Sequence, residues 1–441
     1  MLRPARVATA PPSPSVFRHP DFRLLMASRI SATLAVQAEA VTIGWLVYTV
    51  ARAQHLSIKQ GAFLVGMVGL SQFLPLFAFT LPAGQAADRF DRRRIVQLCL
   101  LALAACDIAL AVIALHPRPS LTPVFVVAAG FGASRAFLQP ATNALAPMLV
   151  PRDELPKAIA WNSLGFQTAS IVGPWMGGAL CAASPAVAFF AAAGFYAVAF
   201  LLQQFIRGNT RPEPHSGSAA AMIREGLAYI WREKIVFGAI SLDLFAVLLG
   251  GAVALLPVFA EDVLKVGAHG FGLLRSGPAL GAAGMAFWLG RRPLARHAGR
   301  WMFIAVAIFG VATLVFAVSR SLWLSIAALA VLGAADMVSV FVRQSLVQIV
   351  TPDAMRGRVA AVSTLFIGAS NELGEFETGV VARFLGPVGA AIFGGVGSLI
   401  VTGTWSQLFP QLRRADRLAA PKADAEEALV EPTAPERAPA A

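Results

Sequence analysis

Long apolar segments alternate with short polar ones along almost the whole chain. Six apolar runs lie in the first half, at 23–50, 60–83, 95–115, 121–149, 158–182 and 185–206, and six more follow, at 233–260, 269–290, 301–318, 321–350, 359–382 and 387–410. Each is long enough to cross a bilayer as a helix, which takes about 20 residues. The pattern predicts an all-α integral membrane protein with twelve transmembrane helices in two six-helix bundles.

The polar segments between these runs predict the domain organisation. Residues 1–22 are short, Pro-rich and basic, and we expect a cytoplasmic tail. The first bundle then covers 23–206 and the second 233–410, joined by a polar cytoplasmic linker at 207–232. Residues 411–441 are rich in Ala, Pro and Glu, which is typical of a disordered tail.

Composition and charge agree with a membrane protein. The chain is 57% hydrophobic and 14% charged, whereas soluble domains average about 25% charged residues. The net charge of +12 does not indicate nucleic-acid binding, because the charges follow the predicted topology. Segments on one side of the membrane hold 26 lysines and arginines, and those on the other side hold 6. The positive-inside rule therefore predicts that both termini are cytoplasmic.

Several kinds of chemistry have no support in the sequence. The three cysteines, Cys99, Cys106 and Cys181, lie inside apolar segments without paired spacing, so we expect neither disulfides nor a metal site. No Gly-Lys pair of a Walker A loop is present, which argues against an ATP-driven pump. No catalytic motif of an intramembrane enzyme is present either. We expect no enzyme activity and no cofactor.

One stretch between the second and third apolar runs carries a recognisable motif. It begins with Gly84, continues through Asp88 and Arg89, and ends with a basic group that includes Arg92 and Arg93. It resembles the loop between helices 2 and 3 of major facilitator superfamily transporters. The resemblance implies a conformational switch, in which Asp88 accepts hydrogen bonds from the start of the eleventh helix, near Arg358, as the cytoplasmic side closes.

A second motif lies in the fifth apolar run, where Gly173 and Pro174 are followed by Gly177 and Gly178. It resembles the Gly-Pro-x2-Gly-Gly motif of exporters and antiporters in the same superfamily, although Ala169 replaces the motif's earlier glycine. Glycines at this spacing also allow ordinary close packing of membrane helices.

The segment 371–382 narrows the resemblance. Its sequence, followed by Leu385-Gly386-Pro387, is similar to the end of the bacterial transmembrane secretion effector branch, which includes enterobactin-exporter-like proteins. This resemblance implies the branch and leaves the substrate open.

Ionisable residues inside the membrane mark candidate pathways, because each one costs free energy unless it faces a cavity or a partner. In the superfamily, helices one, four, seven and ten line the central cavity, and here they carry Glu39, Arg135, Asp243, and the pair Asp336 and Arg343. The two members of this pair are expected to bind each other or a group across the cavity. By contrast, Asp107 lies on the peripheral third helix, and we expect a packing residue whose hydrogen bonds are satisfied.

The eleventh apolar run carries Glu372 and Glu375, which share a helix face. Two carboxylates this close in a low dielectric cannot both ionise easily, so one of them should bind a proton. The alternative for all these charges is a set of fixed ion pairs that hold helices together.

We therefore expect a secondary active transporter that lies in the lipid of a bacterial inner membrane as a monomer. It is expected to export a small amphipathic substrate in exchange for protons. An importer or a lipid-handling permease of the same fold is the alternative within transport. A non-transporting membrane sensor is a third hypothesis, but the charges concentrate on the cavity-lining helices, which argues against it.

The predicted topology can be tested by labelling. Cysteines placed at Ser216 and Ser120 are expected to react from opposite faces of the membrane, because the basic residues place the first inside and the second outside. An impermeant thiol reagent applied to intact cells should label only the Ser120 variant. Labelling of both variants from outside would contradict the twelve-helix topology.

Overall fold

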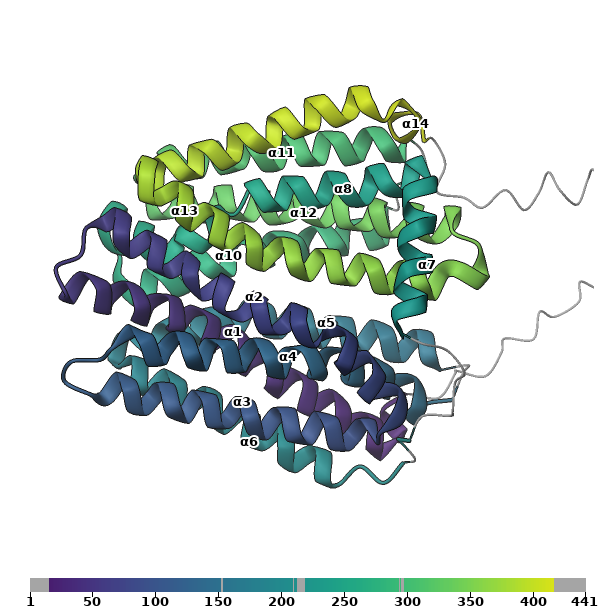
Figure 1. The fold of residues 1–441 in the computed structure, drawn as a ribbon, viewed down its shortest axis with the longest axis horizontal. Helices are drawn as coiled ribbons and strands as arrows, with labels where there is room; N and C mark the ends of the chain where they lie inside the picture. The colour runs from purple at the N-terminus through teal and green to yellow at the C-terminus, as the bar shows by residue number, and fades with distance from the viewer. Residues whose placement is uncertain are drawn as a thin grey trace, which may run out of the picture.

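The computed structural model describes residues 16–151, 154–208, 210–211, 219–292, 294 and 297–415. Within these ranges the regular structure is helical, and the long helices run side by side from one end of the molecule to the other (Figure 1). The first half of the chain contains α1 (Pro20–Ala53), α2 (Ile58–Arg89), α3 (Arg92–Leu115), α4 (Leu121–Leu149), α5 (Leu155–Ala183) and α6 (Pro185–Gln204).

The second half begins with α7 (Ala219–Arg232), which stands across the ends of the long helices in Figure 1. The next helix, α8 (Lys234–Leu249), continues through a 3₁₀ turn at Ala252–Leu255, the short α9 (Leu256–Val258) and a π turn at Phe259–Val263. The remaining helices are α10 (Gly267–Arg291), α11 (Ala298–Val318), α12 (Leu322–Val350), α13 (Asp353–Leu408) and α14 (Pro410–Arg413).

Nine helical segments in the described part of the chain are long and apolar enough to cross a membrane. The helices α5 and α10 are not among them, and α13 counts once although it consists of two helices joined at Gly386. Gly386 has a φ of 78°, a conformation that favours glycine, and Pro387 follows it. The all-α membrane fold is therefore confirmed, while the number of twelve spans stays a prediction.

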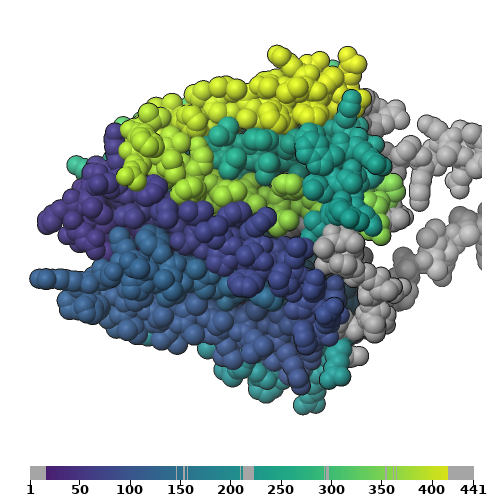
Figure 2. Space-filling view, viewed as in Figure 1, coloured from purple at the N-terminus to yellow at the C-terminus, as the bar shows by residue number. Residues whose placement is uncertain are grey.

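The helices pack in two groups. In the first, α1 contacts α5 and α6, α3 contacts α4 and α6, and α2 contacts α4; in the second, α12 contacts α10 and α11, and α13 contacts α8 and α11. The groups meet where α2 packs against α13 and α5 packs against α10. The space-filling view shows the first group pressed against the second along this line (Figure 2).

The two ends of the molecule differ. We call the end with α7, α14 and the turn between α2 and α3 the basic end, and the opposite end, with the turns at 54–57 and at Gly386, the closed end (Figure 1). Near the closed end the two groups touch through glycines. A Cβ on Gly66 of α2 would lie 2.7 Å from the Cα of Gly379, so these backbones approach without intervening side chains.

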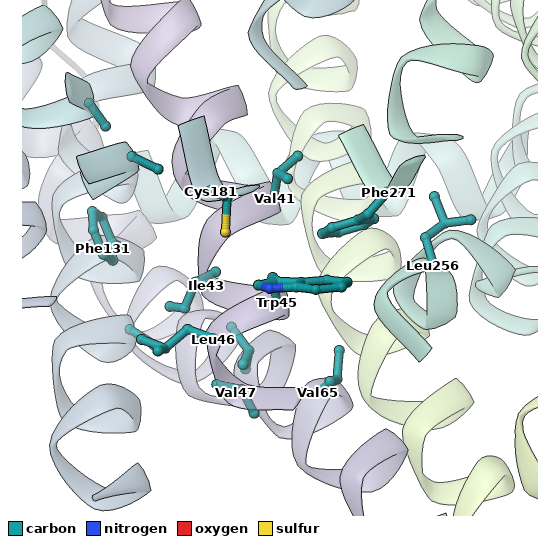
Figure 3. Close-up of a cluster of buried hydrophobic side chains, with 14 of the residues drawn as sticks. Val41, Ile43, Trp45, Leu46, Val47, Val65, Phe131, Cys181, Leu256 and Phe271 are labelled. Atoms are coloured by element: carbon teal, nitrogen blue, oxygen red, sulfur yellow. The ribbon is translucent and has the colours of Figure 1, made fainter. Parts of the chain in front are cut away.

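Aromatic packing fills the space beside these glycines. The rings of Trp45 on α1 and Phe271 on α10 stack with centroids 6.0 Å apart, and Figure 3 shows them lying flat against each other with Val65 and Leu256 nearby. Trp45 and Phe271 are both more than nine-tenths buried. Because they come from different halves of the chain, this cluster seals the contact between the two groups near the closed end.

The stretch at 84–94 is not the open loop that the sequence predicts. α2 and α3 together cover all of it except two residues, so Gly84 lies inside α2. Asp91 caps α3, since its Oδ1 accepts a hydrogen bond from the backbone N–H of Arg93 at 3.0 Å. Arginine is a good helix former, and the basic residues of this stretch extend the two helices.

Packed structure extends into both predicted tails where the structure describes them. Phe22, assigned to the N-terminal tail, lies within α1 and is 1% exposed. Leu412, assigned to the disordered C-terminal tail, is fully buried, and the N–H of Gly299 donates to the carbonyl oxygen of Ala415 at 3.1 Å. Apolar side chains extend the packed structure in both places. Residues 1–15 and 416–441 lie outside the described residues.

The predicted linker contains the amphipathic helix α7, which the polarity of 207–232 did not indicate. One face of α7 packs with apolar residues of α8 and α13. Glu225 of α7 forms an ion pair with Arg358 of α13 at 2.9 Å, and Tyr229 donates a hydrogen bond to the carbonyl oxygen of Val350 at 3.1 Å. Part of the linker is therefore docked on the second group of helices.

Substituting Gly66 tests the glycine contact. Gly66→Leu should separate α2 from α13, because a Cβ there would also lie 2.8 Å from the carbonyl oxygen of Glu375. Labelling of a cysteine at Val65, applied from the closed end, should increase several-fold. Gly194→Leu is the control, since a Cβ at Gly194 meets nothing within 4 Å. Equal labelling in both backgrounds would show that the contact does not hold the closed end together.

Candidate functional site

A central cavity of about 490 Å³ lies between the two groups of helices. Four helices of the first half (α1, α2, α4 and α5) and five of the second (α8, α10, α11, α12 and α13) contribute to its wall. Its wall includes three phenylalanines, one from each of α5, α10 and α11, and five charged residues. These are Phe166, Phe271 and Phe309, and Arg135, Arg275, Asp336, Glu372 and Glu375. A cavity with aromatic walls and a few polar groups suits a small amphipathic molecule.

An ion pair crosses this cavity from one group of helices to the other. Arg135 of α4 donates from Nη1 to Oε1 of Glu372 on α13 at 3.1 Å, and the same nitrogen lies 2.9 Å from Oε1 of Gln72 on α2. The Glu372 side chain is 11% exposed and that of Arg135 is 37% exposed. Sequence reasoning selected both charged residues but gave no indication that they pair with each other or that Gln72 supports them.

Glu375 lines the same cavity one turn along α13 from Glu372, as their shared helix face predicts. It packs against Gly69 of α2, where an added Cβ would lie 2.9 Å from the Cβ of Glu375. Because Gly69 has no side chain, the side chain of Glu375 can occupy this space. Across the cavity, Arg275 donates a long hydrogen bond of 3.4 Å to the carbonyl oxygen of Val253, and it attracts Glu375 electrostatically. The sequence placed Arg275 in a span without assigning it to the site.

Glu39 does not line the cavity, although it was predicted to belong to the pathway. Its side chain points into the first group of helices, where it is 4% exposed and accepts a hydrogen bond of 3.1 Å from the hydroxyl of Tyr196 on α6. It remains within electrostatic reach of Arg135 and Glu372. Glu39 therefore connects to the central ion pair through charge and not through contact with the cavity.

The expectation that Asp107 is a satisfied packing residue is wrong. Asp107 of α3 is fully buried, and within the described residues neither carboxylate oxygen has a hydrogen-bond partner. The buried face of α3 is otherwise apolar, while residues such as Leu101 and Ile108 on the opposite face are exposed. An ionised carboxylate without a partner is too costly at such a place, so a protonated side chain fits this environment.

The second group of helices holds another buried ion pair. Arg343 of α12 donates from Nη1 to Oδ2 of Asp243 on α8 at 3.1 Å, with both side chains less than a tenth exposed. The sequence left open whether Arg343 pairs with Asp336 or with a group on another helix. The structure gives Asp243 as its partner. Asp336 is seven residues from Arg343 on the same helix and therefore lies two turns away from it.

The motif residues at the basic end serve mainly to anchor helices. Arg93 donates hydrogen bonds to the carbonyl oxygens of Ile206 and Gln204, the second at 2.9 Å, and so satisfies the end of α6. Arg92 donates to the carbonyl oxygen of Ala87 at 3.1 Å.

The proposed switch pair is not formed in this structure. Asp88 and Arg89 are exposed in the last turn of α2, and Arg358, the partner expected for Asp88, is bound to Glu225 of α7. The switching role of Asp88 stays a prediction.

The glycine motif of α5 lies where the helix touches its neighbours. A Cβ at Gly177 would lie 2.7 Å from the Cα of Ala38 on α1, and one at Gly178 would lie 2.6 Å from the Cα of Gly272 on α10. Gly173 faces Gln37 of α1 at a similar distance. Pro174 lies inside α5 between these contacts. The motif therefore allows α5 to pack closely in its own group and against the other one.

Polar contacts also join the groups at the closed end, and no motif in the sequence indicated them. The hydroxyl of Tyr48 on α1 donates to Oδ2 of Asp262, in the π turn after α9. Arg52 approaches the other oxygen of Asp262 at 3.5 Å. Tyr48 and Arg52 are about 200 residues from Asp262 in the sequence, so only the fold brings them together.

The buried Asp243–Arg343 pair gives a prediction on stability. Arg343→Met should reduce the free energy of unfolding by about 3–5 kcal/mol at neutral pH, because Asp243 loses its compensating charge. The loss should shrink at acidic pH, where a protonated Asp243 carries no charge. Reversible unfolding in detergent measures both effects. Asp243→Leu combined with Arg343→Met should recover most of the stability, and a double variant as unstable as the single one would contradict this account.

Comparisons with known proteins agree with this geometry. Residues 10–439 match a family described as transmembrane secretion effector. The enterobactin exporter EntS of Shigella boydii is 26% identical over 413 residues, covering 90% of this chain and 93% of that protein. The same exporter from Escherichia coli strain SMS-3-5 matches at the same identity and coverage.

Solved structures share the fold. A POT family transporter in complex with 5-aminolevulinic acid superposes with a TM-score of 0.72 at 13% identity, covering 91% of this chain and 98% of that one. A bacterial homologue of the lysosomal transporter Spinster, inward-facing and occupied, gives a TM-score of 0.65 at 16% identity, covering 90% of this chain and 96% of that one. The chain is a multi-pass membrane transporter and belongs to the transmembrane secretion effector family of the major facilitator superfamily.

Proposed function

We propose that the protein is a proton-coupled exporter that moves a small amphipathic molecule by alternating access. The observation that carries this proposal is the Arg135–Glu372 ion pair, which joins the two groups of helices inside the central cavity. An ion pair between two moving bodies links their separation to the charge of its members. Protons and substrate then act on the same conformational equilibrium.

The chemistry of the cavity supports proton exchange. When Arg135 is bound to Glu372, the guanidinium compensates the charge of the carboxylate. When the groups move apart and the bond breaks, Glu372 is left in a low dielectric without its partner, and proton binding becomes favourable. Glu375, in the same wall and close to Arg275, responds to the same change. Substrate that contacts these carboxylates competes with their protons.

The contacts at the closed end support the conformational part of the cycle. Gly66, Gly178 and Tyr48 join the two groups near that end. We propose that these contacts break when the cavity opens there, while the basic end closes and Asp88 engages the start of α13. The two rocking bodies would be the bundles at 23–206 and 233–410, linked through 207–232.

The direction of transport and the class of substrate rest on different observations. The relatives named enterobactin exporters favour export over import or lipid handling. Three phenylalanines and several charged groups in one cavity favour an amphipathic molecule. We further propose a monomer in the bacterial inner membrane with both termini in the cytoplasm, because the basic residues gather at one end of the molecule.

Transport by reconstituted variants tests the proposal. Glu372→Gln and Glu375→Gln should each reduce proton-driven efflux to background, yet retain exchange of substrate down its own gradient, because glutamine keeps the shape but cannot carry a proton. Enterobactin and a cationic dye such as ethidium would be used as probes in proteoliposomes, with proton movement recorded at the same time.

Glu377→Gln is the matched control, since Glu377 lies on the same helix but does not line the cavity. Its carboxylate accepts a hydrogen bond from the hydroxyl of Thr378 at 3.4 Å. It should transport normally. Full proton-coupled efflux in both cavity variants would remove these glutamates from the coupling.

A further inference from the structure

A second, much smaller cavity lies beside the central one, within the second group of helices. Its volume is about 10 Å³, close to the smallest space that holds one water molecule. The two cavities share Val247, Phe309 and Asp336 in their walls. Asp336 therefore faces the substrate cavity on one side and this small cavity on the other.

The small cavity is polar at two further points. Asp243 and Ser339 line it, and Ser339 is 3% exposed. Within the described residues, the hydroxyl oxygen of Ser339 has no hydrogen-bond partner. A buried hydroxyl and two carboxyl groups around a space of this size provide the two to four partners that an internal water requires. The remaining wall is apolar.

The charges around this cavity do not balance. Asp243 is bound to Arg343 at 3.1 Å, and Asp336 lies within the electrostatic reach of both. α10 contributes Arg275 in the wall of the central cavity, and the residues of α11 at the small cavity, Val306 and Phe309, are apolar. Two carboxyl groups thus depend on one nearby arginine, so a buried site of this kind is neutral only when it holds one proton.

We propose that Asp336, Asp243 and Ser339 form a proton-binding site around one internal water, and that this site opens to the substrate cavity through Asp336. The inference rests on the proposed function for its role in transport, but the site itself does not depend on which substrate is carried. In the conformation described here, Arg343 stabilises the carboxylate of Asp243, and Asp336 holds the proton.

Within the site, this proton can move from Asp336 to Asp243. The O–H bond of Asp336 breaks as its proton goes to the water, and a proton of the same water forms a new O–H bond on Asp243. Asp243 then loses its charge and its bond to Arg343, and the ionised Asp336 attracts the released guanidinium. The total charge is unchanged, but the negative charge has moved to the wall of the substrate cavity. A cationic group or a new proton can bind there.

Infrared difference spectroscopy of the purified protein in detergent, without substrate, tests the site directly. A pH change should produce the band of a carboxyl group that gains or loses a proton, and Asp336→Asn should remove it. Glu372→Gln and Glu375→Gln should keep this band, which separates the present inference from the proposed coupling by those glutamates. A spectrum of Asp336→Asn that matches the wild type would overturn the inference, even if proton-driven efflux is confirmed.

Filling the small cavity tests the water. Ala335→Leu should displace it without removing a polar group, because Ala335 lines the small cavity but not the central one. We expect an altered carboxyl band and proton-coupled efflux reduced several-fold. Ser339→Ala should change the band in the same direction. The control is Ala327→Leu, an exposed position on the same helix, which should behave as the wild type. An unaltered band in Ala335→Leu would exclude the internal water.

Discussion

The ion pair between Arg135 and Glu372 is the contact on which the proposed transport cycle depends. The two residues lie on helices of the two different groups. The charge of either residue would cost free energy in a bilayer without the other. The pair is therefore stable only while the two groups lie together at this depth of the membrane. Its electrostatic energy and the separation of the two groups cannot change independently. Gln72, which accepts a bond from the same guanidinium, fixes the arginine on its own side of the interface.

Packing at the closed end follows a different physical rule. Lipid tails are as apolar as the helices, so helices in a membrane are held together by close contact and by hydrogen bonds more than by the hydrophobic effect. Gly66 with Gly379, and Gly178 with Gly272, supply that contact because they lack side chains. Such contacts are directional and short in range, and a small rotation of one group abolishes them. They suit an interface that opens and closes.

The sequence predicted the helices well because the bilayer imposes their length and composition. The family also followed from short motifs, and the position of Glu375 beside Glu372 followed from helical spacing. The partners of these residues were not predictable in the same way. Asp243 is 100 residues from Arg343, and Arg135 is more than 200 residues from Glu372, so only the packing of the helices selects these pairs. Charge counts along the sequence cannot distinguish among several acids and several bases.

The errors of sequence reasoning have a common physical origin. Asp91 was not singled out, because helix ends depend on capping, and the motif does not show which residue caps the following helix. Asp107 was expected to find a partner because most buried polar groups do, yet it lies on an otherwise apolar face. The amphipathic α7 was hidden by the polarity of its neighbours. In each case the local pattern was clear, but its surroundings decided the outcome.

Acids outnumber bases in both clusters of buried charge. Around the central cavity, two arginines, Arg135 and Arg275, attract three glutamates, Glu39, Glu372 and Glu375. In the second group, Arg343 alone attracts both Asp243 and Asp336. A fixed ion pair that only held helices together would need equal numbers. An excess acid in a low dielectric must instead hold a proton, and it keeps that proton only while its neighbours stay in place. Under the function proposed above, proton binding that depends on conformation would follow from this ratio of acids to bases, and a motion that rearranges the arginines would move protons with them.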